Sequence, residues 1–367
     1  MFLPIMQRRN FLNIIGASSV LTPLALQAAS GKPSTKKLQL AGYDYDRLRM
    51  LSDKKAEITG YEYDYKLTSI GEANSNTFSG PQDYDVTEIG LHPYMLAYAN
   101  DGFRGYSLLP IFPVRIFRHK SIFIRTDRGI DKPEDLKGKK IATPGFSSTS
   151  LTWIRGILQH EYNISMNDVE WIVAKTDSSA DIAGKASAQE RVIPKGLKFT
   201  EGSAGKDESQ LLEDGDVDAL LHAAEPRCYV QGHPKVARLF DNVRATESAY
   251  YKKTGIFPIM HAVAVRNSLV ESDPSIIQSI FKAYSESKSA AQERLAKLGW
   301  VDSMLPWLGQ EMEETYSLLG KDYWSYGIEK NRKTLEALFA YSHEQGLCKK
   351  HLKIEDLFHP ASLTLKE

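Results

Sequence analysis

Residues 133–150 read PEDLKGKKIATPGFSSTS, and this stretch decides the fold class. Its centre, residues 140–143, is a short apolar strand, and Pro144–Gly145 then turns the chain. The hydroxyl side chains of residues 147–150 are suited to cap a helix over residues 151–158, where apolar residues recur at helical spacing. A strand that leads through a glycine turn into an amphipathic helix is typical of α/β proteins.

Strand and helix patterns alternate on both sides of this stretch. Further strands are expected at residues 38–41, 61–67, 85–90, 108–117 and 121–125. Long helices are expected from Asp273, as the cap, to about Gly299, and from Glu329 to Gln345. The alternation implies βαβ units. It predicts an α/β protein whose sheets are mixed but mostly parallel and are flanked by helices.

The sequence also predicts two lobes. The strands at residues 121–125 and 261–266 are suited to carry the chain into an inserted lobe and out of it again. Residues 37–122 together with 262–367 then form lobe 1, and residues 123–261 form lobe 2. Ligands of such open sheets bind beyond the carboxyl ends of the strands, so functional loops are expected there.

Residues 1–30 are expected to be an export signal rather than part of the fold. Arg8 and Arg9 precede an uncharged, weakly apolar run at residues 14–26, which is too short to cross a hydrocarbon core of about 30 Å. Small residues at 28–30 suit a cleavage site. The string QRRNFL at residues 7–12 resembles a twin-arginine signal, which predicts a periplasmic protein that uses the twin-arginine translocase. A disordered N-terminal arm is the alternative.

Composition excludes several classes of protein. The 367 residues carry 46 basic and 46 acidic side chains, a balance that argues against nucleic acid as the main partner. The two cysteines, Cys228 and Cys348, cannot build a zinc ribbon or a CxxC pair. The dinucleotide, P-loop, zincin and nucleophile-elbow motifs do not occur, so no cofactor is expected.

An anion site is the best-supported functional feature of the sequence. The hydroxyl residues Ser147, Ser148, Thr149 and Ser150 open a helix, where free N–H groups and the positive end of the helix dipole favour a carboxylate or phosphate. Ordinary helix capping explains the same residues equally well. Arg115 and Arg118 can hold a planar carboxylate, with surface ion pairing as their alternative role.

Other candidate ligand-binding residues lie in the remaining loops at strand ends. They are Tyr43, Arg47, Glu88, His92, His119, His222 and His261. Glu88 with His92, or His222 with Glu225, can in principle ligate a metal, but neither spacing is a known ligand motif and no metal is expected. Tyr43, Tyr45, Tyr94, Phe146 and Trp153 form either an aromatic pocket wall or ordinary core.

Several strings taken together resemble the 4,5-dihydroxyphthalate decarboxylase family, whose fold is similar to the type 2 periplasmic solute-binding proteins. The strings lie at residues 43–49 (YDYDRLR), 112–118 (FPVRIFR), 121–129 (SIFIRTDRG), 133–139 (PEDLKGK), 153–158 (WIRGIL), 215–219 (GDVDA) and 250–261 (YYKKTGIFPIMH). The similarity covers about residues 38–360 in order. It implies a two-lobed fold of that type, with two hinge strands.

The resemblance implies loss of CO2 from an aromatic dicarboxylate with vicinal hydroxyls. Such a reaction needs cations for the retained carboxylate and an acid that protonates the ring carbon. By residue chemistry, Arg115 and Arg118 suit the first role, and His119 or His92 the second. The family has an acidic, amide-containing stretch where this chain has residues 145–150, and a serine-rich turn where it has His92–Pro93, so a different substrate is expected.

Two functions remain open at this point. In the first, the protein is an exported solute-binding protein that closes its lobes around a small anion, aromatic carboxylates included, and presents it to a membrane transporter. In the second, it is a cofactor-independent decarboxylase of a hydroxylated aromatic dicarboxylate such as 4,5-dihydroxyphthalate. The export signal and the altered loops favour the first function, and the family resemblance favours the second.

Overall fold

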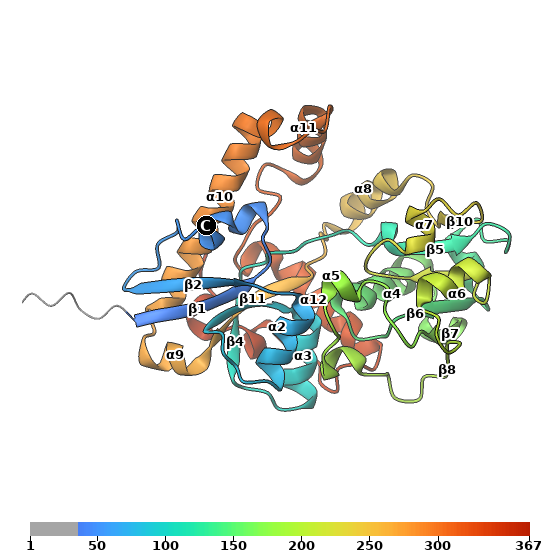
Figure 1. The fold of residues 1–367 in the computed structure, drawn as a ribbon, viewed down its shortest axis with the longest axis horizontal. Helices are drawn as coiled ribbons and strands as arrows, with labels where there is room; N and C mark the ends of the chain where they lie inside the picture. Colours follow the sequence, from blue (N-terminus) through green and yellow to red (C-terminus); the bar gives the residue numbers. More distant parts are fainter. Residues whose placement is uncertain (1–35) are drawn as a thin grey trace, which may run out of the picture. The chain divides into compact units, whose positions relative to one another are not determined.

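The structure is a computed structural model, and it describes residues 36–367. The export signal expected at residues 1–30 lies outside these residues. Within residues 36–367, no helix combines the length and the apolar character needed to cross a bilayer. The described residues form one compact unit that contains two β-sheets (Figure 1).

The first sheet has the strand order β2-β1-β3-β11-β4. Its strands are β1 (Lys36–Gly42), β2 (Tyr61–Leu67), β3 (Val86–Gly90), β4 (Tyr106–Leu109) and β11 (His261–Arg266). Strand β1 pairs in parallel with β2 and β3, whereas β11 is antiparallel to both β3 and β4. The strand predicted at residues 108–117 is shorter in the structure. It ends at Leu109, because the next residue, Pro110, has no N–H to donate to a ladder.

The second sheet has the strand order β10-β5-β9-β6-β7-β8. Its strands are β5 (Ile122–Arg125), β6 (Lys140–Thr143), β7 (Glu170–Val173), β8 (Phe199–Glu201), β9 (Ala219–Leu221) and β10 (Val236–Arg238). Strands β6 to β9 pair in parallel, and β5 is antiparallel to β9 and β10. Both sheets are mixed, and β5 and β11 provide their antiparallel pairs.

Helices pack on both sheets. They are α1 (Arg49–Ser52), α2 (Ile70–Phe78), α3 (Leu91–Asn100), α4 (Thr149–Tyr162), α5 (Ala180–Ala183), α6 (Glu208–Asp214), α7 (Arg227–Val230), α8 (Val243–Thr254), α9 (Asn267–Ser272), α10 (Ile276–Asp302), α11 (Leu308–Leu319), α12 (Arg332–Glu344) and α13 (Ile354–Leu357). Helices α2 and α3 contact β3, and α6 contacts β6 and β9. The helices predicted at residues 151–158 and 329–345 correspond to α4 and α12.

Two segments of the chain run between the sheets and pair with each other. Residues 110–121 lead from β4 to β5, and residues 239–260 lead back from β10 to β11. The N–H of Ile116 donates to the oxygen of Pro258 at 3.1 Å, and the N–H of Met260 donates to that of Val114 at 2.8 Å. The crossing is thus a short antiparallel ladder, which ends directly before β11 and a few residues before β5.

The main core joins residues of both sheets through α4 and α12. Trp153 of α4 is fully buried, and its Nε1 donates to the oxygen of Ile259 in the crossing ladder at 2.9 Å. Gly156 lets α4 approach α12 closely, since a Cβ built there would lie 2.0 Å from the ring of Tyr341. Packing between α4 and α12 therefore fixes the start of α4 beside the crossing segments.

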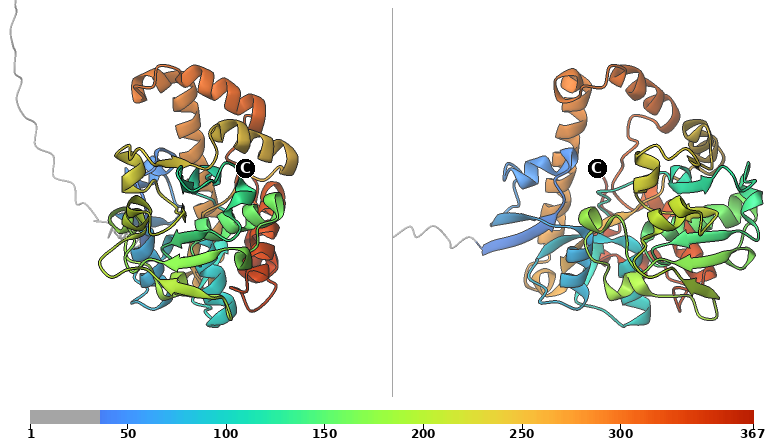
Figure 2. Two further views of the ribbon diagram at one scale, coloured as in Figure 1. Left: turned by 90° about the vertical axis from the view of Figure 1, so that its right-hand side faces the viewer. Right: turned by 45° about the vertical axis from the view of Figure 1, so that its right-hand side comes forward.

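Helix α10 differs from its prediction at both ends. It begins at Ile276, and Asp273 accepts from the N–H of Ser275 at 3.1 Å rather than acting as the cap residue. Its backbone leaves helical geometry at Leu298, where the helix was expected to end, and then continues to Asp302. Figure 2 shows α11 and the later part of α10 standing away from the two sheets, whereas the first turns of α10 are buried in the core. Trp300 and Trp307 near this bend are 79% and 68% exposed.

Candidate functional site

A cavity of about 380 Å³ lies between the two sheets, a volume suited to a small organic ligand. Its walls include residues just beyond the carboxyl ends of β1, β6, β7 and β9, which is where ligands bind in open α/β sheets. Seven residues predicted from the sequence line it: Tyr43, Arg118, Ser148, Thr149, Ser150, His222 and His261. Tyr45, Ile116 and Met260 add aromatic and apolar surface.

The crossing segment presents alternate residues to the cavity. Val114, Ile116 and Arg118 line it, whereas Arg115 does not. The guanidinium of Arg115 instead donates to the oxygen of Ser325 at 2.9 Å and to the side chain of Asn331. The expectation that both arginines hold the ligand is therefore corrected for Arg115, because residues of odd separation in an extended segment face opposite sides.

Arg118 is a buried cation on the cavity wall. Only 4% of the residue is exposed, its Nη1 donates to the oxygen of Ala223 at 2.9 Å, and its Nε approaches the sulfur of Met260 at 3.3 Å. Burial lowers the pKa of Arg118 to about 10, with the charge of Glu247 opposing the shift, so the guanidinium is charged at neutral pH. Within residues 36–367, its Nη2 has no acceptor and the group forms no ion pair.

The first turn of α4 lies next to this guanidinium. Ser148 caps the helix by accepting from the N–H of Leu151 at 3.3 Å, and the hydroxyl of Ser150 approaches the same Met260 sulfur at 3.5 Å. The N–H groups of Thr149 and Ser150 have no acceptor among residues 36–367. Both helix capping and anion binding are thus compatible with these residues. Ser147 is fully buried outside the cavity wall, where its Oγ accepts from the N–H of Val192.

A carboxylate–imidazole pair forms another corner of the cavity. Nδ1 of His261 lies 2.5 Å from Oε1 of Glu88, which also accepts from the hydroxyl of Tyr45 at 3.0 Å. Glu88 itself is 2% exposed and lies behind the lining residues Tyr43, Tyr45 and His261. Burial and the charge of Glu88 raise the pKa of Tyr45, which keeps this phenol protonated. Nε2 of His261 has no partner among residues 36–367.

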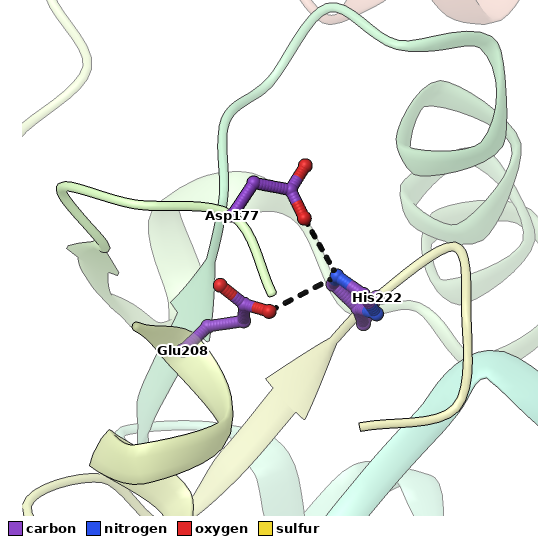
Figure 3. A group of neighbouring side chains, drawn as sticks. All are labelled: Asp177, Glu208 and His222. Atoms are coloured by element: carbon purple, nitrogen blue, oxygen red, sulfur yellow. Dashed lines mark hydrogen bonds and ion pairs between the residues drawn. The ribbon is translucent and has the colours of Figure 1, made fainter. Parts of the chain in front are cut away.

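A second histidine lies between two carboxylates on another part of the wall (Figure 3). Nε2 of His222 is 3.1 Å from Oε1 of Glu208 and 3.3 Å from Oδ1 of Asp177. Burial alone would lower the pKa of His222, but hydrogen bonds to Asp177 and Glu208 outweigh it and raise the pKa to about 10. Glu225, the metal partner considered from the sequence, instead pairs with Arg238.

Three other predicted site residues do not line the cavity. The ring of His92 is fully buried between the oxygen of Ser147 and the hydroxyl of Ser342, each at 2.7 Å, and burial lowers its pKa to about 4. His119 packs against the rings of Phe240 and Tyr250, and neither of its ring nitrogens has a hydrogen-bond partner within residues 36–367. Arg47 stacks over Tyr45 and Trp324 and donates to the oxygen of Pro113.

These positions correct the proposed proton donors. His92 and His119 were expected as catalytic acids. Both are buried away from the cavity, so neither can reach a ligand bound in it. Glu88 and His92, considered as a metal pair, have separate partners. Of the aromatic cluster, Tyr43 and Tyr45 line the cavity, whereas Tyr94, Phe146 and Trp153 are fully buried core.

Sequence reasoning missed Asp177 and Glu208. Asp177 follows β7, a strand not recognised in the sequence, so its loop was not among the functional loops expected. The signal was present in the residues Trp171-Ile172-Val173, a short apolar run parallel to β6 in the structure. Glu208 opens α6, a position typical of an acidic residue at a helix N-terminus.

Comparison with known proteins identifies the family. A protein of Comamonas testosteroni named 4,5-dihydroxyphthalate decarboxylase is 34% identical over 330 residues, which cover 90% of this chain and 98% of that relative. The chain belongs to the 4,5-dihydroxyphthalate decarboxylase family. A family member of the same name from Pseudomonas putida is 34% identical over 218 residues, 59% of this chain and 81% of the relative. A family model described as NMT1/THI5 like matches residues 109–193.

Solved structures confirm the expected fold of this family member. The periplasmic aliphatic sulphonate binding protein SsuA of Escherichia coli is 14% identical, with a TM-score of 0.52 over 89% of this chain and 98% of that one. A periplasmic sulfonate-binding protein SsuA of Methylobacillus flagellatus gives 14% identity and a TM-score of 0.50 over 89% and 92%. The two-lobed α/β fold of periplasmic binding proteins is therefore the fold of this chain.

Proposed function

We propose that this member of the 4,5-dihydroxyphthalate decarboxylase family is an exported solute-binding protein that holds a small aromatic carboxylate in the cavity between its sheets. The observation that carries the proposal is Arg118, a buried guanidinium on the cavity wall that has no carboxylate partner in the described part of the chain. Burying an uncompensated charge is costly, and a bound anion would relieve this cost. Arg115 and Arg155 are also buried and also donate to carbonyl or amide oxygens, but neither of them lines this cavity.

The rest of the cavity suits a flat anion. The free N–H groups at the start of α4 lie on the same side as Arg118, because Ser150 and Arg118 share the sulfur of Met260. Tyr43, Ile116 and Met260 supply surface for the faces of an aromatic ring. The name of the Comamonas relative supports an aromatic dicarboxylate as the ligand class.

Export and delivery to a transporter belong to the same proposal. The string Gln7 to Leu12 supports passage through the twin-arginine translocase, and the fold is that of proteins named as periplasmic sulphonate binders. In this reading, the two crossing segments act as a hinge, closure around the ligand buries it, and a membrane transporter recognises the closed form.

Calorimetric titration of the purified protein with 4,5-dihydroxyphthalate, benzoate and an alkanesulfonate tests the proposal. Arg118→Gln should weaken binding of the preferred anion by roughly 1.5 to 3 kcal/mol, the value of a hydrogen bond to a charged group, or roughly 10- to 150-fold. Arg128→Gln removes a more exposed arginine outside the cavity and should leave the affinity unchanged. Equal affinities in wild type and Arg118→Gln would contradict the proposal.

Decarboxylation is the second candidate, favoured by one specific observation, the pair of His261 with buried Glu88. Glu88 binds Nδ1 of His261 and so orients the imidazole, whose Nε2 remains available at the cavity as a proton donor. In that reaction the bond between the ring and the carboxylate breaks and CO2 leaves. The electron pair of the broken bond stays on the ring carbon, which takes the proton from Nε2 of His261. Arg118 would hold the carboxylate that is retained.

Release of CO2 separates the two functions. Protein incubated with 4,5-dihydroxyphthalate should bind it and return it unchanged if the protein is a receptor. Sustained CO2 release that is lost in His261→Asn would overturn the receptor function and establish the decarboxylase. Release that persists at the same rate in His261→Asn would exclude His261 as the proton donor.

A further inference from the structure

The three side chains around His222 have the spacing of ligands on one metal ion. The ligand atoms of Asp177, Glu208 and His222 all lie within 4.8 Å of one another. The imidazole nitrogen is 3.1 Å from one carboxylate oxygen and 3.3 Å from the other. Ligands about 2.0 to 2.1 Å from a tetrahedral zinc ion are themselves separated by roughly 3.3 Å, so the trio needs little rearrangement to accept one.

The groups around the trio hold its ligands in place. Nδ1 of His222 lies 2.8 Å from the oxygen of Ala224, so a proton on Nδ1 is donated there and leaves Nε2 to face the carboxylates. The N–H of Ser178 donates to Oε1 of Glu208 at 3.0 Å, and the N–H of Ser179 donates to Oδ1 of Asp177 at 2.8 Å. A backbone acceptor behind the histidine and donors behind the carboxylates are usual supports of metal ligands.

The charge of the trio also favours a cation. His222 and Glu208 are 1% and 0% exposed, yet neither carboxylate is paired with a lysine or arginine in the part of the chain described. Two carboxylates and one imidazole that share a small volume form a donor set of the N and O type, which suits a divalent cation.

We propose that Asp177 Oδ1, Glu208 Oε1 and His222 Nε2 bind one Zn²⁺ ion on the cavity wall. Asp177 and His222 line the cavity whereas Glu208 does not, so a fourth coordination position on the cavity side would be open to the ligand. Three protein ligands of the N and O type with one open position are characteristic of zinc sites that bind a substrate or water. If the proposed function holds, the ion adds a second positive charge for the anion near Arg118, whose Nη1 donates to the oxygen of Ala223, the residue after His222.

The test uses Zn²⁺ alone, added to the full protein after chelation and dialysis. Wild type should take up one ion per chain, measured by calorimetry and by elemental analysis. Glu208→Gln and Asp177→Asn should each weaken uptake at this site by roughly 100-fold or more, because each removes a charged ligand. Glu225→Gln, a neighbouring carboxylate paired with Arg238, should bind as wild type does.

A background substitution and a second metal ion separate binding at this site from binding elsewhere. His343 and His351 have adjacent rings at another place, so every variant is made with His351→Ala as well, which removes that histidine pair. Co²⁺ replaces Zn²⁺ in parallel, and its visible absorption should be present in wild type and absent in Asp177→Asn, whose partly exposed side chain makes loss of folding a small risk.

Uptake of well under one ion by wild type would overturn the zinc site. Uptake by Asp177→Asn and Glu208→Gln equal to that of wild type would overturn it as well. The proposed function fails separately, through anion titration of Arg118→Gln. Loss of zinc binding with intact anion binding would contradict only the proposal that the ion strengthens binding of the anion.

Discussion

Glu88 and His261 meet because their strands are neighbours in the first sheet. Glu88 of β3 stands opposite Val263 of β11, so His261, two residues earlier, lies on the same face, and its Nδ1 reaches Oε1 of Glu88 at 2.5 Å. Tyr45 donates to the same carboxylate oxygen and the N–H of Tyr43 to the other one. One buried carboxylate thus organises three of the side chains that line the cavity.

Replacing this carboxylate by its amide tests whether the pair performs chemistry. Glu88→Gln keeps the shape of the side chain and an acceptor for Tyr45 but removes the negative charge next to Nδ1 of His261. If the protein releases CO2, the rate should fall at least about 100-fold, the lower bound for loss of general acid catalysis. Affinity for an unreacted aromatic carboxylate should change by less than threefold, as measured by calorimetry.

The exposed residue Glu62 on β2 provides the control, and Glu62→Gln should alter neither rate nor affinity. A rate that is unchanged in Glu88→Gln would show that the pair only positions Tyr43 and Tyr45. In a pure receptor no CO2 appears, and the variant then reports on the packing of this corner alone.

The sequence predicts where the strands of this fold lie better than it predicts which strands pair with each other. The strand patterns at residues 38–41, 61–67 and 121–125 correspond to β1, β2 and β5, because alternation and apolar runs are local signals. The antiparallel insertion of β11 between β3 and β4 depends on pairing across more than 150 residues, for which a single sequence carries no signal. The contact of Glu88 with His261 follows from that pairing and was therefore not predicted.

The two arginines of the crossing segment show what local reasoning overlooks. Arg115 and Arg118 were expected to hold the same ligand, yet only Arg118 lines the cavity. An extended segment alternates its faces, and Val114 and Ile116 share the face of Arg118. Applying period-two alternation to this segment would have separated the two arginines. The trio around His222 was out of reach, since it joins residues from three separate elements.

Export through the twin-arginine route predicts a simple requirement. Arg8→Lys together with Arg9→Lys keeps the charge of residues 1–30 but removes the pair that the translocase reads. The variant should accumulate in the cytoplasm as the full-length chain, whereas wild type should appear in the periplasmic fraction in shortened form. Arg128→Lys, in the folded part, should be exported normally. Periplasmic recovery of the double variant at the wild-type level would contradict this route.

Close packing of α4 against α12 predicts a large effect for a small substitution. A Cβ on Gly156 would lie 2.0 Å from the ring of Tyr341, which packs edge-on against Trp153. Gly156→Ala should lower the free energy of unfolding by about 1 to 3 kcal/mol through overpacking, despite the better helix propensity of alanine. Gly309→Ala, in α11 with open space around it, should be neutral or stabilising by up to about 1 kcal/mol. Urea denaturation measures both, and equal stabilities would contradict the packing argument.

The buried histidines predict a loss of stability in mild acid. Burial lowers the pKa of both His92 and His119 to about 4, below the value of about 6.5 in an unfolded chain. The unfolded state therefore binds more protons between these values, and the stability present above pH 6.5 is lost as the pH falls toward 4. Each histidine contributes a loss on the order of 3 kcal/mol.

His119→Phe removes two ring nitrogens that have no partner within residues 36–367 and keeps an aromatic ring beside Tyr250. Its free energy of unfolding, measured by urea denaturation from pH 7 to 4.5, should fall less steeply than that of wild type by about 1 kcal/mol per pH unit. Anion binding at pH 7 should be unchanged, because His119 does not line the cavity. Parallel slopes would contradict the lowered pKa of His119, and a weakened anion affinity would contradict its position outside the cavity wall.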